Sequence, residues 1–181
     1  ITMGKELEYW DIYDANKQLT GRTMKRNDWC LKDDEYHLTV LGVIARPDGK
    51  YLITKRVMTK SWAPGWWEVS GGAAMAGEES KEAVIREVKE ETGLQMIPKY
   101  RAIVTFVSDK YETEQMHLFT VDDFVGEATY PTYEGLETDT PDCREGNLAW
   151  VEKTRIPSLP LWEGDRVFLS LLEREEPFFS L

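Results

Sequence analysis

The sequence has few cysteines and no apolar run long enough to cross a membrane. Its two cysteines, Cys30 and Cys143, lie far apart, so neither a disulfide framework nor a zinc site is predicted. No stretch approaches the roughly 18 apolar residues of a membrane-spanning helix, and the N-terminus lacks an apolar signal region. We therefore expect a protein of the reducing cytoplasm that does not enter a membrane.

The sequence is also poor in basic residues relative to acidic ones. With 22 Lys and Arg against 33 Asp and Glu, the net charge is -11, which disfavours binding to duplex nucleic acid. A small phosphorylated ligand could still be bound through metal ions. The 181 residues, 41% of them hydrophobic, suffice for one domain spanning 1–181, with an extension at 1–36 and a catalytic core at 37–181.

The expected elements alternate between strands and helices. β-favouring residues around turn formers predict an N-terminal β-hairpin at 8–26. Segment 126–146 has no clear periodicity and is predicted to be a long surface loop. The expected core elements are strands at 37–45, 51–55, 102–107, 116–121 and 147–151, and helices after the glycine-rich stretch 71–77 and at 162–173.

Glycines bracket the first of these helices. Gly71, Gly72 and Gly77 allow tight turns and a close approach of the backbone to a ligand. Gly93 stands where the helix should end. Val84 and Val88 form an apolar stripe that can pack on a sheet, which leaves the polar face of the helix beside a cleft.

Three carboxylates share that polar face. At about 100° per residue, Glu90 lies about 60° to one side of Glu87 and Glu91 about 40° to the other. Clustered carboxylates repel one another and need a compensating cation, for which Mg²⁺, or Mn²⁺, is the natural oxygen-seeking candidate. The expected substrate then carries phosphate, and the expected reaction is hydrolysis of a phosphoanhydride. The alternative interpretation is an ordinary solvated helix face.

The whole segment resembles a known motif. It reads Gly72, five residues, Glu78, seven residues, and then Arg86 to Leu94, and this matches the Nudix box at about nine fixed positions. The resemblance implies an α/β fold, the Nudix α/β/α sandwich with a mixed β-sheet, and assigns Glu87, Glu90 and Glu91 as metal ligands, with the Gly72 carbonyl as a further one. Arg86 could clamp a phosphate or pair with Glu78, and we favour the pairing.

Residues 9–56 are similar to the branch of the Nudix superfamily that contains isopentenyl diphosphate isomerase. That isomerase uses a catalytic cysteine just before the box, whereas residues 67–72 here read Trp-Glu-Val-Ser-Gly-Gly. Cys30 lies far upstream and is interpreted as an ordinary small hydrophobic residue. An isomerase-like enzyme remains the alternative function, and a catalytically silent nucleotide-binding regulator is a second one.

A segment near the C-terminus, Leu159 to Asp165, resembles the part of some Nudix enzymes that reads a purine base. Trp162 could stack on a base while Asp165 accepts hydrogen bonds from its edge. The same two residues could simply begin and cap a helix. Trp62, Trp66 and Trp67 either line the mouth of the cleft or fill the core.

The remaining candidate site residues rest on weaker patterns in the sequence. By its place before the strand at 147–151, Glu145 resembles an additional catalytic carboxylate of Nudix enzymes, with Glu134 and Glu137 as alternatives. Arg56 resembles a phosphate-contacting residue, although a strand-end Arg is often only a solubilising residue. His37 and His117 lie in apolar strands and are interpreted as core histidines with satisfied hydrogen bonds.

The combined expectation is a cytoplasmic, Mg²⁺-dependent pyrophosphohydrolase. Its substrate would be a nucleoside triphosphate, including one with an oxidised purine, or a nucleoside diphosphate linked to another moiety. The catalytic residues would be Glu87, Glu90 and Glu145, and the substrate-binding ones Arg56, Trp162 and Asp165. A homodimer could form through the N-terminal hairpin.

Overall fold

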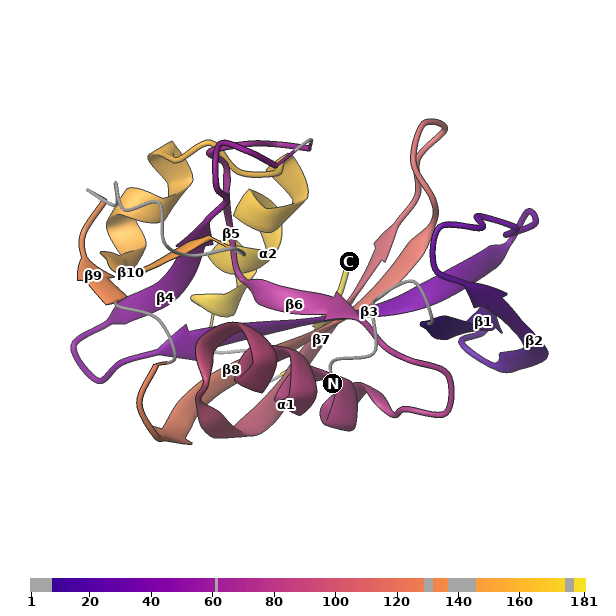
Figure 1. The fold of residues 1–181 in the computed structure, drawn as a ribbon, viewed down its shortest axis with the longest axis horizontal. Helices are drawn as coiled ribbons and strands as arrows, with labels where there is room; N and C mark the ends of the chain where they lie inside the picture. Colours follow the sequence, from indigo (N-terminus) through magenta and orange to yellow (C-terminus); the bar gives the residue numbers. More distant parts are fainter. Residues whose placement is uncertain (1–7, 61, 129–131, 137–145, 175–177) are drawn as a thin grey trace.

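A computed structural model of the chain describes residues 8–60, 62–128, 132–136, 146–174 and 178–181 (Figure 1). The elements in chain order are β1 (Tyr9–Asp14), β2 (Leu19–Lys25), β3 (Glu35–Ala45), β4 (Lys50–Lys55), β5 (Trp67–Glu68), β6 (Ser70–Ala73), α1 (Ser80–Thr92), β7 (Gln95–Phe106), β8 (Glu114–Val125), β9 (Thr132–Glu134), β10 (Asn147–Glu152), the 3-10 helix η2 (Lys153–Ser158), α2 (Glu163–Leu172) and β11 (Phe179–Ser180).

The strands form one mixed sheet, as predicted. Its main path runs β11-β7-β8-β3-β4-β10-β9. The pairs β3–β8, β9–β10 and β7–β11 are parallel, and the remaining pairs are antiparallel. The long strand β3 lies at the centre because its middle also pairs with β6 and its beginning with β1. Strand β3 therefore connects the N-terminal hairpin, the glycine-rich strand and the core.

Helix α1 covers one face of the sheet. It begins after Glu79, whose backbone N–H donates to the Glu82 carboxylate, and it ends at Gly93, which has a φ of 80°. Val84 and Val88 are fully buried against β3, and each buried side chain of this size stabilises the fold by about 1.5–3 kcal/mol. Gly42 makes this close packing possible, since a Cβ there would lie 3.0 Å from Val88 Cγ2 and 3.2 Å from Val84 Cγ2.

Helix α2 and η2 cover the opposite face. Phe168, Leu169 and Leu172 of α2 are buried in a second core with residues of β3, β4 and β10. Figure 1 shows α1 and α2 on different sides of the sheet. The arrangement is the predicted α/β/α sandwich.

The N-terminal hairpin is present as β1 and β2. Trp10, Ile12 and Met24 form a small buried cluster of their own, and β1 continues the sheet by pairing with β3. Among the residues that the structure describes, no helix is long and apolar enough to cross a membrane.

Several elements differ from the expectation. Strands β7 and β8 each extend well beyond the predicted ranges 102–107 and 116–121. The segment predicted as a surface loop contains β9, which pairs with β10, so that prediction was wrong for residues 132–134. Strands β5, β6 and β11 were not predicted because strands of two to four residues carry too little periodicity to be recognised.

Candidate active site

The glycine-rich strand and the acidic helix meet closely at one point. Gly72 lies in β6, opposite Val40 of β3. A Cβ on Gly72 would lie 2.6 Å from Cδ of Glu87 and 2.7 Å from both of its carboxylate oxygens. Only glycine can occupy this position while Glu87 keeps its place, which explains why a glycine must precede the helix at this spacing.

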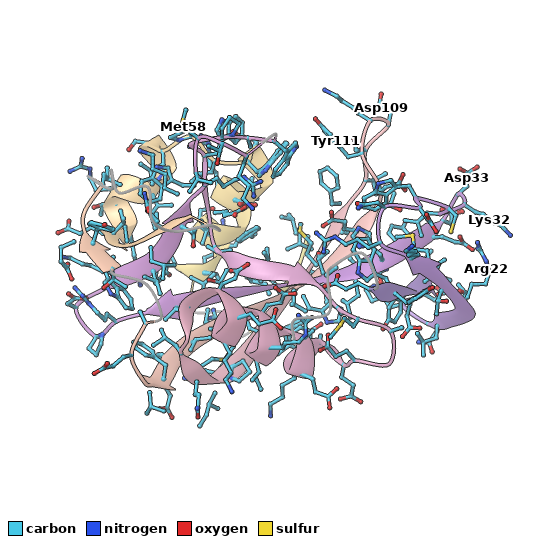
Figure 2. The ribbon with its side chains drawn as sticks, in the orientation of Figure 1. Arg22, Lys32, Asp33, Met58, Asp109 and Tyr111 are labelled. Carbon is cyan, nitrogen blue, oxygen red and sulfur yellow. The ribbon has the colours of Figure 1, made fainter. Side chains whose placement is uncertain are left out.

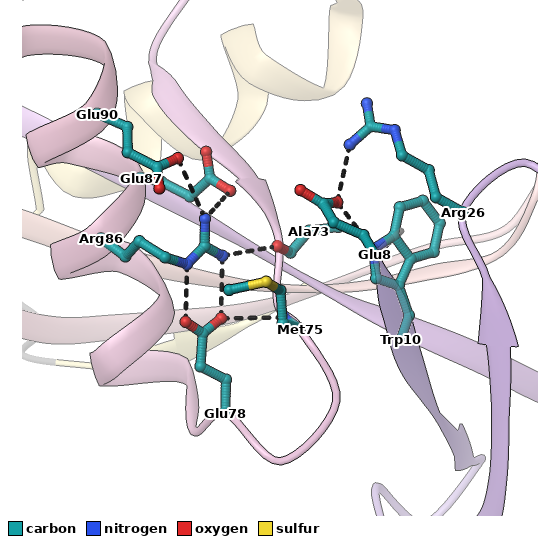
Figure 3. A network of polar contacts seen from close by, with 9 residues as sticks. All are labelled: Glu8, Trp10, Arg26, Ala73, Met75, Glu78, Arg86, Glu87 and Glu90. Carbon is teal, nitrogen blue, oxygen red and sulfur yellow. Dashed lines mark hydrogen bonds and ion pairs between the residues drawn. The ribbon is translucent and has the colours of Figure 1, made fainter. Parts of the chain in front are cut away.

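Arg86 holds the acidic residues in place (Figure 3). Its Nε and Nη2 donate to the two oxygens of Glu78 at 2.7 and 2.9 Å, which confirms the predicted pairing. Nη2 also donates to the Ala73 carbonyl at 3.1 Å, and Nη1 donates to Glu87 at 2.8 Å. The contact of Nη1 with Glu90 is longer, at 3.4 Å. Burial alone would raise the pKa of Glu78, but the hydrogen bonds from Arg86 hold it below its usual value.

The three predicted metal ligands differ in their surroundings. The Glu87 side chain is 15% exposed, whereas that of Glu90 is 60% exposed, and Glu91 is half-buried. Within the described part of the chain, no three Asp, Glu, His or Cys side chains are gathered as a ready-made metal site. The predicted ligands are carboxylate and carbonyl oxygens, the kind of atom that hard divalent metal ions bind.

A second group of residues lies around the start of α2. The Trp162 ring packs against the rings of Trp62, Trp66 and Tyr111, with centroid distances of 5.0, 5.5 and 6.1 Å. Trp62 and Trp66 are 43% and 36% exposed, whereas Trp67 is buried, so the three tryptophans are divided between the surface and the core. Tyr111 extends from the β7–β8 hairpin (Figure 2), so the cluster joins two elements that are distant in sequence.

Three acidic side chains influence one another near the start of α2. Asp165 lies in the first turn of α2, and burial, together with the negative charges of Glu68 and Glu114, raises its pKa from 3.8 to about 7. Glu114 begins β8 and accepts a hydrogen bond from the Thr39 hydroxyl at 3.1 Å. A half-buried carboxyl group with a raised pKa beside exposed aromatic rings is typical of a ligand-binding site.

Arg56 lies beside the same cluster. Its Nη1 contacts both oxygens of Glu68 at 3.2 and 3.3 Å, and its guanidinium lies 4.8 Å from the centroid of the Trp62 ring. The phosphate contact expected of Arg56 stays a prediction. Trp162 directly precedes α2 as its N-cap residue, so the helix-starting role is confirmed and the base contact of Trp162 and Asp165 stays a prediction as well.

The three candidates for the additional catalytic carboxylate lie between β8 and β10 in the sequence. Glu145 and Glu137 lie outside the described residues. Glu134 lies on the outer strand β9 and pairs with Arg46 and Lys50. These hydrogen bonds lower the pKa of Glu134 to about 2. A carboxylate bound to two cations is a poor base, so these contacts argue against Glu134 as the additional base.

Two interpretations of single residues were wrong. Cys30 is exposed and does not fill a core. His37 is buried as expected and its ring stacks on Trp10 at 4.8 Å; neither ring nitrogen makes a hydrogen bond among the described residues, but Nε2 lies 3.5 Å from Oε1 of Glu114. His117 fits the expectation better, because Nδ1 lies 3.0 Å from the Tyr100 hydroxyl.

The sequence reasoning missed Glu68, Tyr111 and Glu114. Glu68 directly follows Trp66 and Trp67 in the sequence, whereas Tyr111 and Glu114 reach this region only through tertiary packing. Glu114, for example, lies opposite His37 in the β3–β8 pair.

Comparison with known proteins places this geometry in a family. Residues 35–172 match the NUDIX domain. An uncharacterised Nudix hydrolase of Listeria monocytogenes is 39% identical over 89 residues, which are 49% of this chain and 52% of that protein, so the chain spans about half the length of this relative. The nucleoside triphosphatase NudI of an Enterobacter species is 28% identical over 140 residues, 71% of this chain and 92% of its own.

Solved structures agree. The crystal structure of a MutT protein from Methanosarcina mazei superimposes with a TM-score of 0.62 at 25% identity, covering 77% of this chain and 94% of that one. The family match extends over most of the chain and includes both the glycine-rich strand and the acidic helix. The chain therefore belongs to the Nudix hydrolase family.

Proposed function

We propose that this enzyme is a Mg²⁺-dependent hydrolase that cleaves a pyrophosphate bond in a nucleotide and releases a monophosphate product. The substrate is a nucleoside triphosphate, including one with an oxidised purine, or a nucleoside diphosphate linked to another moiety. The observation that carries the proposal is the Glu87 carboxylate, which is packed on the Gly72 backbone and held there by Arg86.

The residues around this point each have a part in the proposed reaction. Glu87, Glu90, Glu91 and the Gly72 carbonyl would hold Mg²⁺, which supplies charge neutralisation for the pyrophosphate and a water of lowered pKa. The Arg86 guanidinium fixes the position of Glu87 by a hydrogen bond. It also binds Glu78 and so ties α1 to the segment between β6 and α1. Glu145 is our proposed further base.

The nucleotide part of the proposal rests on the aromatic cluster. Exposed indole rings next to acidic side chains offer a stacking surface and hydrogen-bond acceptors, as a purine base requires. The similarity to a protein named nucleoside triphosphatase points to the same class of substrate. We place the enzyme in the cytoplasm, because its two cysteines have no framework spacing. A homodimer through β1 and β2 stays a prediction.

The test is the variant Glu90→Gln, assayed for phosphate release from nucleoside triphosphates, nucleotide sugars, ADP-ribose and dinucleoside polyphosphates with Mg²⁺. We expect kcat to fall by about 100-fold or more, because a metal ion stabilises the transition state by several kcal/mol. The fold should persist, since Glu90 is 60% exposed. Glu82→Gln on the same helix is the matched control, because glutamine also completes a capping box. Normal turnover by Glu90→Gln would refute the proposed site.

A further inference from the structure

The segment between β6 and α1 takes part of its support from the N-terminal hairpin. Ala76 N donates to the Tyr9 carbonyl at 2.7 Å, and Gly77 N donates to Oδ2 of Asp11 at 2.8 Å. The hairpin strands β1 and β2 precede residues 35–172, the part of the chain that matches the NUDIX domain. These two bonds are therefore additional to the contacts that the domain makes within itself.

Apolar packing joins the same two parts of the molecule. The hairpin has a small buried cluster of Trp10, Ile12 and Met24. Ala73, at the end of β6, packs against this cluster, and its carbonyl accepts a hydrogen bond from Arg86 at 3.1 Å. In Figure 3, Ala73 lies between Trp10 and Arg86. The end of β6 is thus held by the hairpin on one side and by α1 on the other.

A series of short contacts leads from Asp11 to the proposed metal ligand Glu87. Gly77 has a φ of 82°, so the chain turns sharply directly before Glu78. Glu78 accepts two hydrogen bonds from Arg86, at 2.7 and 2.9 Å, and Arg86 donates a third to Glu87 at 2.8 Å. Asp11 therefore fixes Gly77. The turn at Gly77 sets where the Glu78 carboxylate meets Arg86.

We propose that Asp11 is a positioning residue that holds the turn at Gly77. Through this turn it keeps the Arg86 guanidinium, and with it Glu87, in place for metal binding. The N-terminal hairpin is then part of the framework of the active site. This inference rests on the proposed function, because Glu87 is a metal ligand only under that proposal. A carboxylate suits the role, since it binds a backbone N–H more strongly than a neutral acceptor does.

The first test measures the turn itself. Asp11→Ala removes the acceptor of the Gly77 N–H, so we expect solvent exchange of this amide, measured by NMR, to become roughly 10-fold faster, as for the loss of a charge-assisted hydrogen bond. Asp11 is only half-buried, so the variant should fold. Asp11→Asn keeps an oxygen at this place and should restore most of the protection. An unchanged exchange rate of the Gly77 amide in Asp11→Ala would overturn the proposal.

Asp14→Ala is the matched control for this test. The Asp14 carboxylate also accepts two backbone N–H groups, those of Asn16 and Gln18 at 2.8 and 3.0 Å. Both of these bonds lie within the turn between β1 and β2. We therefore expect Asp14→Ala to leave the exchange of the Gly77 amide at the wild-type rate.

The second test measures metal binding without turnover. Mn²⁺ binding, followed by the loss of the EPR signal of free Mn²⁺, should weaken by roughly 10-fold in Asp11→Ala, which is the lower end of what partners of metal ligands contribute. With Mg²⁺, kcat should fall by a similar factor while KM for the nucleotide stays nearly unchanged, because Asp11 acts on the metal ligands. Asp11→Asn should recover most of both losses, and Asp14→Ala should match the wild type. Faster exchange at Gly77 with unchanged Mn²⁺ binding would show that the hairpin supports only the loop, against the proposed role.

A double variant tests the route of the coupling. If Asp11 acts through Glu78, adding Asp11→Ala to Glu78→Gln should weaken Mn²⁺ binding by less than Asp11→Ala does alone. Fully multiplicative losses would mean that Asp11 reaches the metal ligands by another route, and the assignment would fail. A wild-type protein that hydrolyses no nucleotide would refute the proposed function, whereas exchange at Gly77 and Mn²⁺ binding would still decide the role of Asp11.

Discussion

Replacing Asp165 should make the protein less sensitive to alkaline pH. Burial, followed by the charges of Glu68 and Glu114, raises the pKa of Asp165 from 3.8 to about 7 in the folded protein. The folded state therefore binds this proton more tightly than the unfolded chain does. The stability that this proton on Asp165 contributes is fully present below pH 3.8 and is lost as the pH rises through 7.

The size of the effect follows from the same values. The difference between 3.8 and 7, at 1.36 kcal/mol per pH unit, corresponds to about 4 kcal/mol in all. About 3 kcal/mol of this falls between pH 5 and pH 9, because the unfolded chain is already ionised at pH 5. For a domain of this size, 3 kcal/mol corresponds to roughly 6–12 °C in Tm.

Urea unfolding of the wild type and Asp165→Asn at pH 5, 7 and 9 measures this contribution. We expect the free energy of unfolding of the variant, relative to that of the wild type, to increase by about 3 kcal/mol from pH 5 to pH 9. Glu163→Gln in the same turn is the control, because the Glu163 side chain is 86% exposed and screened by solvent. If the difference between wild type and Asp165→Asn stays constant over this range, the burial argument for Asp165 is refuted.

Two further predictions concern other parts of the fold. Gly72→Ala should abolish turnover in the phosphate-release assay, because its Cβ would lie 2.6 Å from Cδ of Glu87; retained activity would show that Glu87 need not occupy this place. Burial, and then the charge of Lys17, lowers the pKa of His117 to about 4, so its contribution to stability is present above pH 6.5 and is lost as the pH falls through 4. His117→Gln should therefore resist acid unfolding better than the wild type, by up to about 3 kcal/mol near pH 4, and an unchanged acid midpoint in circular dichroism would contradict this.

Local signals made the acidic helix predictable. Gly93 at its end, the apolar stripe with Val84 and Val88, and the Arg86–Glu78 pair all lie within one short segment, so their geometry follows from helical spacing. The sandwich followed from the resemblance to a family with that motif. The layer order and the strand register of β3 and β8 are not encoded in any such short pattern.

The aromatic cluster around Trp162 was predictable only in part. Trp162 and Asp165 are recognisable because they stand together at the start of a helix, but their partners come from other parts of the chain. Trp62 and Tyr111 reach Trp162 only after the sheet has formed, and Glu114 reaches the neighbourhood of Asp165 in the same way. Such long-range contacts depend on tertiary packing, which the spacing of residues along the chain does not reveal.

The contacts of Arg86 also bear on how the acidic face can fold. A guanidinium shared by Glu78, Glu87 and Glu90 is an internal counter-ion, supplied by the same helix that carries two of these charges. It reduces their mutual repulsion during folding, before any divalent ion binds. Assembly of this face can therefore be separated from loading of the metal, so chelation should stop turnover and leave the fold intact.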